Sequence, residues 1–421
     1  MAKTLLDKEQ VHVILAVTFG NILEWYEIYS FAYLVPQLSI LFFQFSKTLS
    51  NWISAFLIFG IGLIFRPVGA IIFGRMGDLI GRKNAFVASI LIMTVPTFLM
   101  GCLPTYAQWG WYAPFFLVLL RIIQGIPAAG EVPGTICFLY ENTHTHNKRF
   151  ITSWTGVGNQ IGAILGVVIS VIITQFMSEK FLMSWGWRIS FWSGGLFGLF
   201  GIYLRRTLHE TPLFEKLKKK HKLDTETTLE LIINHKKRIA LGTAFGVVNA
   251  STFYLIATYV PTFFDESIGL SFYGNAIVSL SILILTTVFL PFFGKVGDKF
   301  NNKLIFILST ILIIILLLPL SIAILHKNLI LILIIGLVYI IPVTCISALL
   351  PYLLAHLFPT AIRFTGVGLA VNLADGLIGG FTPAISLFLL QVMRNNTAFV
   401  WYILLCALVS LVSYFFIKKR F

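Results

Sequence analysis

The sequence predicts an all-α integral membrane protein with twelve transmembrane helices in two six-helix halves. Three observations carry this prediction. The 421 residues are 57% hydrophobic and only 11% charged, which is more apolar surface than a soluble protein of this length can bury. About twelve apolar runs reach the roughly 18 residues that cross a bilayer. A motif rich in glycine and charge occurs near residue 74 and again near residue 294, half a chain length later, as expected for an internal repeat.

The apolar runs follow one another with short polar connections between them. We expect the membrane spans at 12–38, 52–74, 85–104, 111–140, 153–177, 187–206, 238–264, 272–294, 304–325, 329–352, 363–391 and 398–417. The longest polar connection is rich in lysine and follows the sixth span. The predicted domains are therefore an N-terminal six-helix bundle at 1–206, a basic cytoplasmic linker at 207–237 and a C-terminal six-helix bundle at 238–421.

The net charge of +14 does not indicate nucleic-acid binding, because the basic residues are distributed by topology. With the N-terminus in the cytoplasm, 24 of the 31 Lys and Arg residues fall on cytoplasmic segments or at the cytoplasmic ends of spans, and only seven fall on the outer side or deeper within spans. This is the positive-inside rule. It predicts a multi-pass protein of a bacterial-type cytoplasmic (inner) membrane with both termini in the cytoplasm.

The repeated motif joins the second span to the third and the eighth to the ninth. Its glycines allow helix ends to approach closely, an Asp at a helix start favours the positive end of the helix dipole, and its cations can bridge to a neighbouring helix in one conformation only. We therefore expect a gating role for Gly74, Gly77, Asp78, Gly81, Arg82 and Lys83 in the first copy and for Gly294, Gly297 and Asp298 in the second. The motif resembles the loop between helices 2 and 3 of the major facilitator superfamily.

Several charged side chains lie inside the predicted spans, where a charge is costly unless it is paired or wetted. Glu24 and Glu27 are three residues apart in the first span and share a helix face. Arg66 lies in the second span, and Arg121 and Glu131 lie in the fourth. Pro127 and Pro133 are expected to break the fourth helix, and broken helices tend to line cavities.

Short motifs in a fixed order narrow the resemblance to the metabolite–proton symporter family within that superfamily. They are Leu23-Glu24-Trp25-Tyr26-Glu27, Arg66-Pro67, Arg121 with Gln124-Gly125, Gly130-Glu131, Trp185-Gly186-Trp187-Arg188, Glu210-Thr211-Pro212 and Phe358-Pro359-Thr360. The sequence departs from the family pattern at Glu27, where an Asp is usual, at Ala129 before Glu131, and at Asp375, where members carry an apolar residue.

The resemblance implies proton-coupled uptake of a small metabolite that carries a carboxylate. We expect a symporter that imports a zwitterionic osmolyte such as proline or glycine betaine. A proton symporter of a di- or tricarboxylate or keto acid, such as citrate, 2-oxoglutarate or a shikimate-like compound, is the close alternative. A non-transporting membrane receptor with the same fold is an alternative of another class.

Arginine matches a carboxylate in a two-pronged geometry, so Arg121 or Arg66 is expected to bind the substrate carboxylate. The acids Glu131, Glu24 and Glu27 are the candidates for carrying the proton. The same charges could instead form fixed ion pairs that hold the helices together. Asp375 could bind the cation of a zwitterion, and the further candidates for substrate contact are Trp25, Tyr26, Tyr254 and Asn372.

Enzymatic activity is not expected, because the sequence has no nucleophile–base pair, metal-ligand cluster or phosphate-binding loop. No cofactor is expected beyond the proton as coupling ion. The expected partners are a small-molecule substrate and the lipid bilayer, with no nucleic acid and no obligate protein partner.

Overall fold

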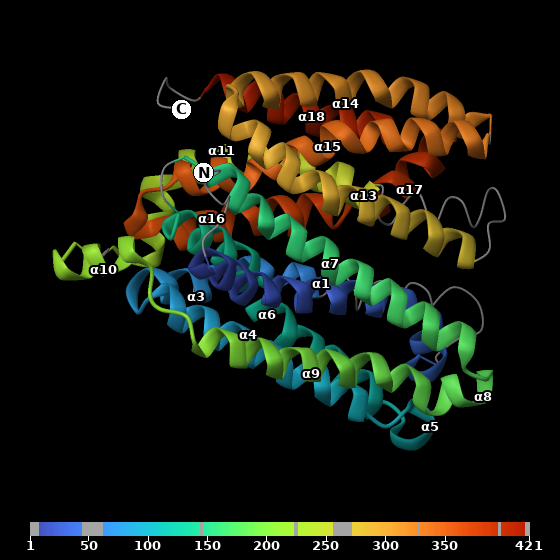
Figure 1. The fold of residues 1–421 in the computed structure, drawn as a ribbon. Helices are drawn as coiled ribbons and strands as arrows, with labels where there is room; N and C mark the ends of the chain where they lie inside the picture. The colour runs from blue at the N-terminus through green and yellow to red at the C-terminus, as the bar shows by residue number, and fades with distance from the viewer. Residues whose placement is uncertain are drawn as a thin grey trace. The chain divides into compact units, whose positions relative to one another are not determined.

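The computed structural model describes residues 8–43, 62–143, 146–222, 226–255, 272–326, 328–394 and 397–416. In these ranges the chain forms helices and their connections, and no strand (Figure 1). The helices of the first half of the chain are α1 (Lys8–Phe42), α3 (Arg66–Leu79), α4 (Arg82–Cys102), α5 (Tyr106–Trp109), α6 (Tyr112–Glu141), α7 (Lys148–Phe176), α8 (Glu179–Phe181), η1 (Leu182–Gly186) and α9 (Trp187–Arg206). The later helices are α10 (Pro212–Lys219), α11 (Thr228–Tyr254), α13 (Phe272–Lys299), α14 (Asn302–Leu325), α15 (Leu329–Leu357), η3 (Thr360–Ile362), α16 (Arg363–Asn372), η4 (Leu373–Gly379), α17 (Thr382–Met393) and α18 (Phe399–Phe415).

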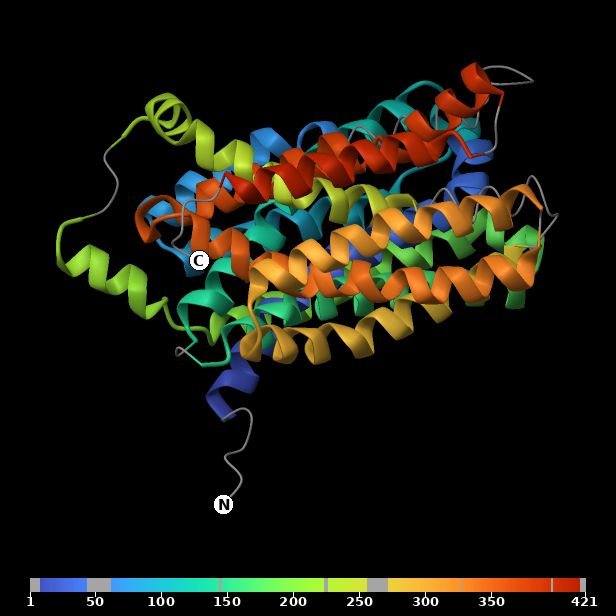
Figure 2. The same cartoon turned by 90° about the horizontal axis from the view of Figure 1, so that it is seen from above.

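The chain divides into two compact units. Unit 1 comprises Met1–Asn142, Gly158–Thr225 and the short segment Thr360–Gly368. Unit 2 comprises Thr143–Val157, Glu226–Pro359 and Leu369–Phe421. Within unit 1, α4 packs against α6 and α9, and α1 packs against the same two helices. Within unit 2, α15 packs against α13 and α14, which lie side by side with it in Figure 2.

The prediction of an all-helical membrane protein is confirmed. Seven helices in the described ranges are long and apolar enough to cross a membrane, and α18 is a shorter apolar helix. The first, second, sixth and seventh predicted spans overlap α1, α3, α9 and α11, and the parts at 52–61 and 256–264 lie outside the described residues. The predicted boundaries of the domains at 206 and 238 stay a prediction.

Glycines on α7 allow it to pack tightly on α1 within unit 1. A Cβ atom at Gly158 would lie 3.0 Å from the carbonyl oxygen of Thr18, and one at Gly166 would lie 2.7 Å from that of Tyr26. Gly162, between them, is placed against the backbone of Ile22 in the same way. Side chains at these positions would force the helices apart, so the spacing of four residues marks a close helix–helix seam.

The expected break in the fourth membrane helix is wrong. The helix α6 runs without interruption from Tyr112 to Glu141, with Pro127 and Pro133 inside it. Each proline removes a single backbone donor, and a membrane helix tolerates this where neighbouring helices pack against it. The irregular helix is instead the eleventh span, where the π-helical segment η4 separates α16 from α17 and contains Asp375. Such π-helical turns are frequent at functional sites.

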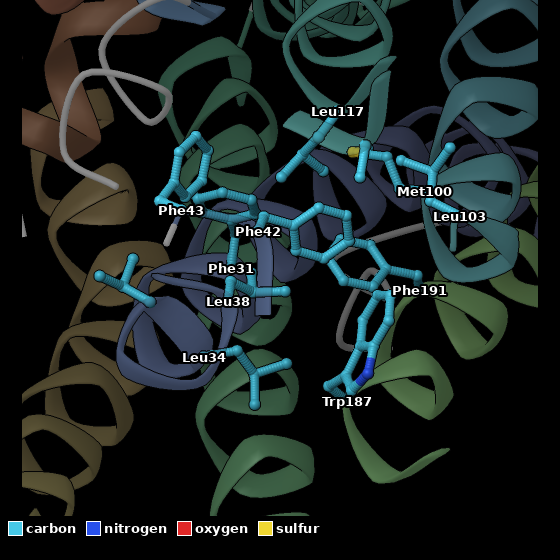
Figure 3. Close-up of a cluster of buried hydrophobic side chains, with 12 residues drawn as sticks. Phe31, Leu34, Leu38, Phe42, Phe43, Met100, Leu103, Leu117, Trp187 and Phe191 are labelled. Carbon is cyan, nitrogen blue, oxygen red and sulfur yellow. The ribbon is translucent and has the colours of Figure 1, made fainter. Parts of the chain in front are cut away.

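An apolar cluster fills one end of unit 1 and fixes the helices that carry the charged residues. Its buried side chains come from α1, α4, α6 and α9 and are shown in Figure 3. Phe42 meets Trp187 edge to face with their ring centroids 5.4 Å apart, and Trp187 is completely buried. Phe31 belongs to the same cluster and also lies beneath Arg121. The cluster therefore supports the site described next.

Candidate functional site: a charged cavity in unit 1

A cavity inside unit 1 collects four of the charged residues predicted from the sequence. Its empty space amounts to about 410 Å³, a figure that includes the open solvent at its mouth. Its lining comes from α1, α6 and the segment that leads into α3, and consists of Glu24, Glu27, Ile28, Gly62, Leu63, Arg66, Arg121, Gln124, Gly125 and Ala128. Two acids and two arginines thus face one space, and their formal charges cancel.

Glu24 and Arg66 form an ion pair across the cavity wall. The Nη2 atom of Arg66 lies 2.6 Å from Oε1 of Glu24, and both side chains are almost completely buried. A buried carboxylate and guanidinium at this distance compensate each other's desolvation. The positive charge of Arg66 is therefore already balanced from within unit 1.

Arg121 is held differently, by one hydrogen bond and one aromatic ring. Its Nη1 donates to Oε1 of Gln124 at 2.6 Å, and its guanidinium carbon lies 3.6 Å from the centroid of the Phe31 ring. Its Nε and Nη2 atoms are buried and have no hydrogen-bond partner among the described residues. These two atoms form the edge of the guanidinium that can bind a carboxylate with two parallel hydrogen bonds.

Glu27 is held by neutral groups alone. The Thr97 hydroxyl of α4 donates to one carboxylate oxygen, Oε1. The side-chain amide of Gln124 donates to the other, Oε2, from 2.5 Å. The same amide nitrogen also lies 2.8 Å from the Thr97 hydroxyl oxygen. No ion pair is formed by Glu27 in the described part of the chain, and the charge of Arg121 acts on it without a direct contact, across Gln124.

Glu131, the remaining acid of α6, lies outside this cavity lining in a closed ion pair. Arg205 of α9 donates to both carboxylate oxygens of Glu131, at 2.9 and 2.5 Å, and also donates to the carbonyl oxygen of Phe86. The hydroxyl of Ser89 donates to Glu131 from 2.6 Å. Both partners of the pair are completely buried. Arg205, which lies at the end of the sixth predicted span, is therefore a buried partner of Glu131.

The first copy of the glycine motif lies in a second charged cluster of unit 1. Arg82 donates to the carbonyl oxygens of Gly77 and Thr360, at 2.7 and 2.5 Å, and its Nε lies 3.2 Å from Glu141. Arg363 pairs with the other oxygen of Glu141 at 2.6 Å. These contacts confirm the expected bridging by Arg82, and Lys83 likewise donates from Nζ to a backbone carbonyl, that of residue 206.

Asp78 was expected at the start of a helix, but it lies in the last turn of α3. Its carboxylate instead accepts from the backbone N–H groups of Phe364 and Thr365, at 3.1 and 2.9 Å, in the first turn of α16. The expected interaction with a helix dipole therefore exists, but with another helix.

The glycines of the first copy allow this approach. A Cβ atom at Gly74 would lie 2.6 Å from the Cα of Thr365, and one at Gly77 would lie 2.5 Å from the ring of Phe364. Gly81, the residue before α4, has φ +126°, a conformation that favours glycine.

The second copy repeats the arrangement inside unit 2. Asp298 accepts from the backbone N–H groups of Arg149 and Phe150, at 2.9 and 3.0 Å, in the first turn of α7. Gly294 and Gly297 again lie where a Cβ atom would meet neighbouring atoms, in this case Ser153 and Leu349. Both copies thus place a carboxylate on the N-terminus of a helix distant in sequence.

The remaining candidates for substrate contact are not in the lining of the unit 1 cavity. Tyr26 is buried and donates to the carbonyl oxygen of Ser190 on α9 at 2.7 Å, so its hydroxyl joins two helices. Trp25 is also buried. Tyr254, Asn372 and Asp375 belong to unit 2. A substrate-binding role for any of these residues stays a prediction.

Four polar residues of unit 1 were not singled out from the sequence as site residues: Gln124, Thr97, Arg205 and Glu141. Gln124 was visible as part of a motif three residues after Arg121, which places both on one helix face. Thr97 carried no signal, because a lone hydroxyl in an apolar helix usually bonds its own backbone.

Comparison with known proteins agrees with these observations. The family model described as Major Facilitator Superfamily matches residues 17–371. A glycine betaine/proline/ectoine/pipecolic acid transporter of Dickeya dadantii (strain 3937) is 27% identical, over 99% of this chain and 85% of that protein. A proline/betaine transporter of Escherichia coli (strain K12) is 28% identical, over 97% and 84%. A citrate-proton symporter of Salmonella typhi is 30% identical, over 95% and 92%.

Solved structures show the same fold. A proton:xylose symporter of the major facilitator superfamily, bound to 6-bromo-6-deoxy-D-glucose, superposes with a TM-score of 0.81 at 18% identity, over 98% of this chain and 95% of that one. The xylose transporter from E. coli in a partially occluded inward-open conformation gives 0.73 at 19% identity, over 98% and 99%. With its apolar helices, its repeated glycine motif and a family match over most of its length, the chain is a multi-pass membrane protein that belongs to the Major Facilitator Superfamily.

Proposed function

We propose that the protein is a proton-coupled symporter that imports a small zwitterion with a single carboxylate, such as proline or glycine betaine. The observation that carries this proposal is the state of Arg121. It is a buried cation in a cavity lining whose Nε and Nη2 atoms have no hydrogen-bond partner in the described ranges. Buried polar groups are normally satisfied, so this edge is suited to a ligand that brings two acceptor atoms.

The substrate class follows from counting the cations of the cavity. Arg66 is balanced by Glu24, which leaves Arg121 as the cation available to a ligand within the described lining of unit 1. One guanidinium edge matches one carboxylate. Two of the relatives described above are named for proline and betaine, which carry a single carboxylate.

The proton is carried by Glu27 in this proposal. Its oxygens are held by a hydroxyl and an amide, so it can gain or lose a proton without breaking an ion pair. Glu24 and Glu131 are ion-paired at 2.6 and 2.5 Å, and a proton on either would leave a buried arginine without its counter-charge. These two acids are the second choice.

Gln124 connects the proton site to the substrate site. It accepts from Arg121 with its amide oxygen and donates to Glu27 with its amide nitrogen. A change of charge on Glu27 therefore reaches Arg121 through one side chain. Coupled transport needs such a link, because each ligand must change the other's affinity.

We propose a gating role for the two glycine motifs, whose aspartates each bind the start of a distant helix. We further propose that the protein lies in the bacterial inner membrane with both termini in the cytoplasm, as the charge distribution predicts. It acts as a carrier, without enzymatic activity, cofactor or obligate protein partner. A non-transporting receptor with this fold is the alternative of another class.

A proton symporter of citrate or a related acid is the second candidate. The relative from Salmonella typhi, the most identical of those described above, is named a citrate-proton symporter. A tricarboxylate needs more than one cation, and Arg66 could supply the second if Glu24 took up a proton.

Uptake into proteoliposomes tests the proposal. Labelled glycine betaine, proline and citrate are offered with and without an inward proton gradient. We expect glycine betaine or proline to accumulate only with the gradient. Uptake of citrate without the zwitterions would support the second candidate. If none of the three enters or binds, the carrier proposal is contradicted for these substrates.

A further inference from the structure

The Thr97 hydroxyl has one hydrogen but two acceptor oxygens within hydrogen-bond distance. Its single hydroxyl hydrogen faces Oε1 of Glu27 and also the carbonyl oxygen of Met93, at 2.8 Å, one turn earlier on α4. Its oxygen accepts from the Gln124 amide at 2.8 Å. A hydroxyl has one donor and two acceptor positions. When Glu27 is ionised, two oxygens therefore compete for one hydrogen.

The contact with Arg121 fixes which way the side-chain amide of Gln124 is turned. A guanidinium can only donate, so the amide oxygen of Gln124 must face Arg121. Its nitrogen then points to Oε2 of Glu27 and to Thr97, with one hydrogen for each. Oε2 is thereby occupied by a donor, and a proton that binds Glu27 there would face the amide hydrogen.

A proton on Oε1 meets no such conflict. Protonated Oε1 donates to the Thr97 oxygen, and the Thr97 hydrogen turns to the carbonyl of Met93, which already lies within hydrogen-bond distance. The Thr97 oxygen then accepts from both Glu27 and Gln124, which fills its two acceptor positions. Every hydrogen in the network has an acceptor, and one added proton completes it.

We propose that Thr97 is a positioning residue that directs the transported proton to Oε1 of Glu27, and that its hydroxyl reverses direction as the proton binds and leaves. This inference rests on the proposed function. No covalent bond changes apart from the O–H bond that forms on Glu27 and breaks on release.

Other charges act on Glu27 without a hydrogen bond to either of its oxygens. The ionisable groups whose charges reach it come from α1 and α6 and are Glu24, Arg121 and Glu131. Arg66 of α3 is paired with Glu24 at the same cavity, and Arg205 of α9 is paired with Glu131. The described residues in hydrogen-bond contact with the carboxylate are Thr97 and Gln124.

The test compares three variants in proteoliposomes. Thr97→Val removes the hydroxyl and keeps the shape, and Thr97→Ser keeps the hydroxyl. The control is Thr94→Val, because Thr94 lies one turn earlier on α4, is also buried, and donates to the carbonyl of Ile90 on its own helix. Each variant is measured by substrate counterflow, which needs no net proton movement, and by accumulation driven by a proton gradient.

We expect Thr97→Val to keep counterflow within about twofold of wild type and to lose about tenfold in gradient-driven accumulation, as for a lost hydrogen bond to an ionised group. Its pH profile should shift, whereas Thr97→Ser and Thr94→Val should behave as wild type. Equal losses in both assays, no loss in Thr97→Val, or a Thr97→Ser variant as impaired as Thr97→Val would overturn the inference. Failure of the proposed function is distinguishable, because wild type would then show no dependence on the gradient.

Discussion

The two units of this protein bury very different side chains. All ten charged residues that are buried in the described ranges belong to unit 1: Glu24, Glu27, Arg66, Asp78, Arg82, Arg121, Glu131, Glu141, Arg205 and Arg363. Unit 2 buries hydroxyls and amides instead, among them Ser251, Asn275 and Asn372. Three helices of unit 2 are also more apolar, with mean hydropathies of 2.4, 3.0 and 2.7 for Gly274–Lys299, Asn302–Leu325 and Ile330–Leu357, against 2.0 and 1.6 for Arg82–Cys102 and Tyr112–Glu141 of unit 1.

The two copies of the motif make the same contact between a carboxylate and a helix N-terminus, but in the described ranges only unit 1 surrounds it with buried charges. Both copies of the glycine motif hold an aspartate on the first turn of a distant helix. In the first copy Arg82 adds a bridge to Glu141, whereas the equivalent position of the second copy is Asn302. A buried charge is costly without a partner. Ten buried charged side chains in one unit therefore indicate a functional role in addition to helix packing.

The largest effect is expected at Arg121. Arg121→Gln removes the charge and the two-pronged edge, and should raise the KM for a zwitterionic substrate by about 100-fold or abolish uptake. Arg121→Lys restores the charge without the fork and should recover only part of the affinity. The measurement is concentration-dependent counterflow.

Arg188→Gln is the control for Arg121. Arg188 also belongs to unit 1, but its Nη1 donates to the carbonyl oxygens of Gly101 and Leu103 and it is not in the cavity lining. Its variant should leave the KM unchanged. An unchanged KM in Arg121→Gln, or equal changes in both variants, would contradict the proposed role of Arg121.

A smaller effect is expected at the two motif aspartates, and it should differ between the units. Asp78 is completely buried and accepts three hydrogen bonds from Phe364 and Thr365, whereas Asp298 is only partly buried, accepts two from the backbone at the start of α7 and lies 3.5 Å from the guanidinium of Arg149. Replacement by Asn turns an acceptor into a donor that faces a backbone N–H. Each unsatisfied group costs about 1–3 kcal/mol, so Asp78→Asn should lower the midpoint of thermal unfolding more than Asp298→Asn.

Thermal unfolding in detergent measures both variants side by side. The conservative variants Asp78→Glu and Asp298→Glu test whether the carboxylate itself is needed. Equal losses for the two Asn variants would mean that the motif copies stabilise their units equally. The difference between unit 1 and unit 2 would then not extend to the motifs.

The fold could be predicted from the sequence because apolar length and repeated glycines are local signals. Apolar runs long enough to cross a bilayer can be recognised from the sequence directly. The spacing of Gly158, Gly162 and Gly166 predicts a close helix–helix contact but does not identify the partner helix. Residue types also selected Glu24, Glu27, Arg66 and Arg121, since a charge in an apolar run is exceptional.

The contacts that could not be predicted join residues that are far apart in the sequence. The partner of Glu131 is Arg205, 74 residues later, and the helix bound by Asp78 begins 285 residues later at Arg363. Arg205 sits at a helix end next to a basic connection, so its sequence context indicates a surface charge. Thr97 is a single hydroxyl in an apolar helix, and only the positions of Glu27 and Gln124 distinguish it from Thr94.

The central claim is that Glu27 carries the proton, and one comparison tests it most directly. Glu27→Gln and Glu131→Gln are reconstituted and assayed for counterflow and for accumulation driven by a proton gradient. Glu27→Gln should retain counterflow with little dependence on pH and lose accumulation, while Glu131→Gln, which breaks the pair with Arg205, should lose both in proportion to its lower stability. Accumulation by Glu27→Gln at the wild-type level would contradict the account.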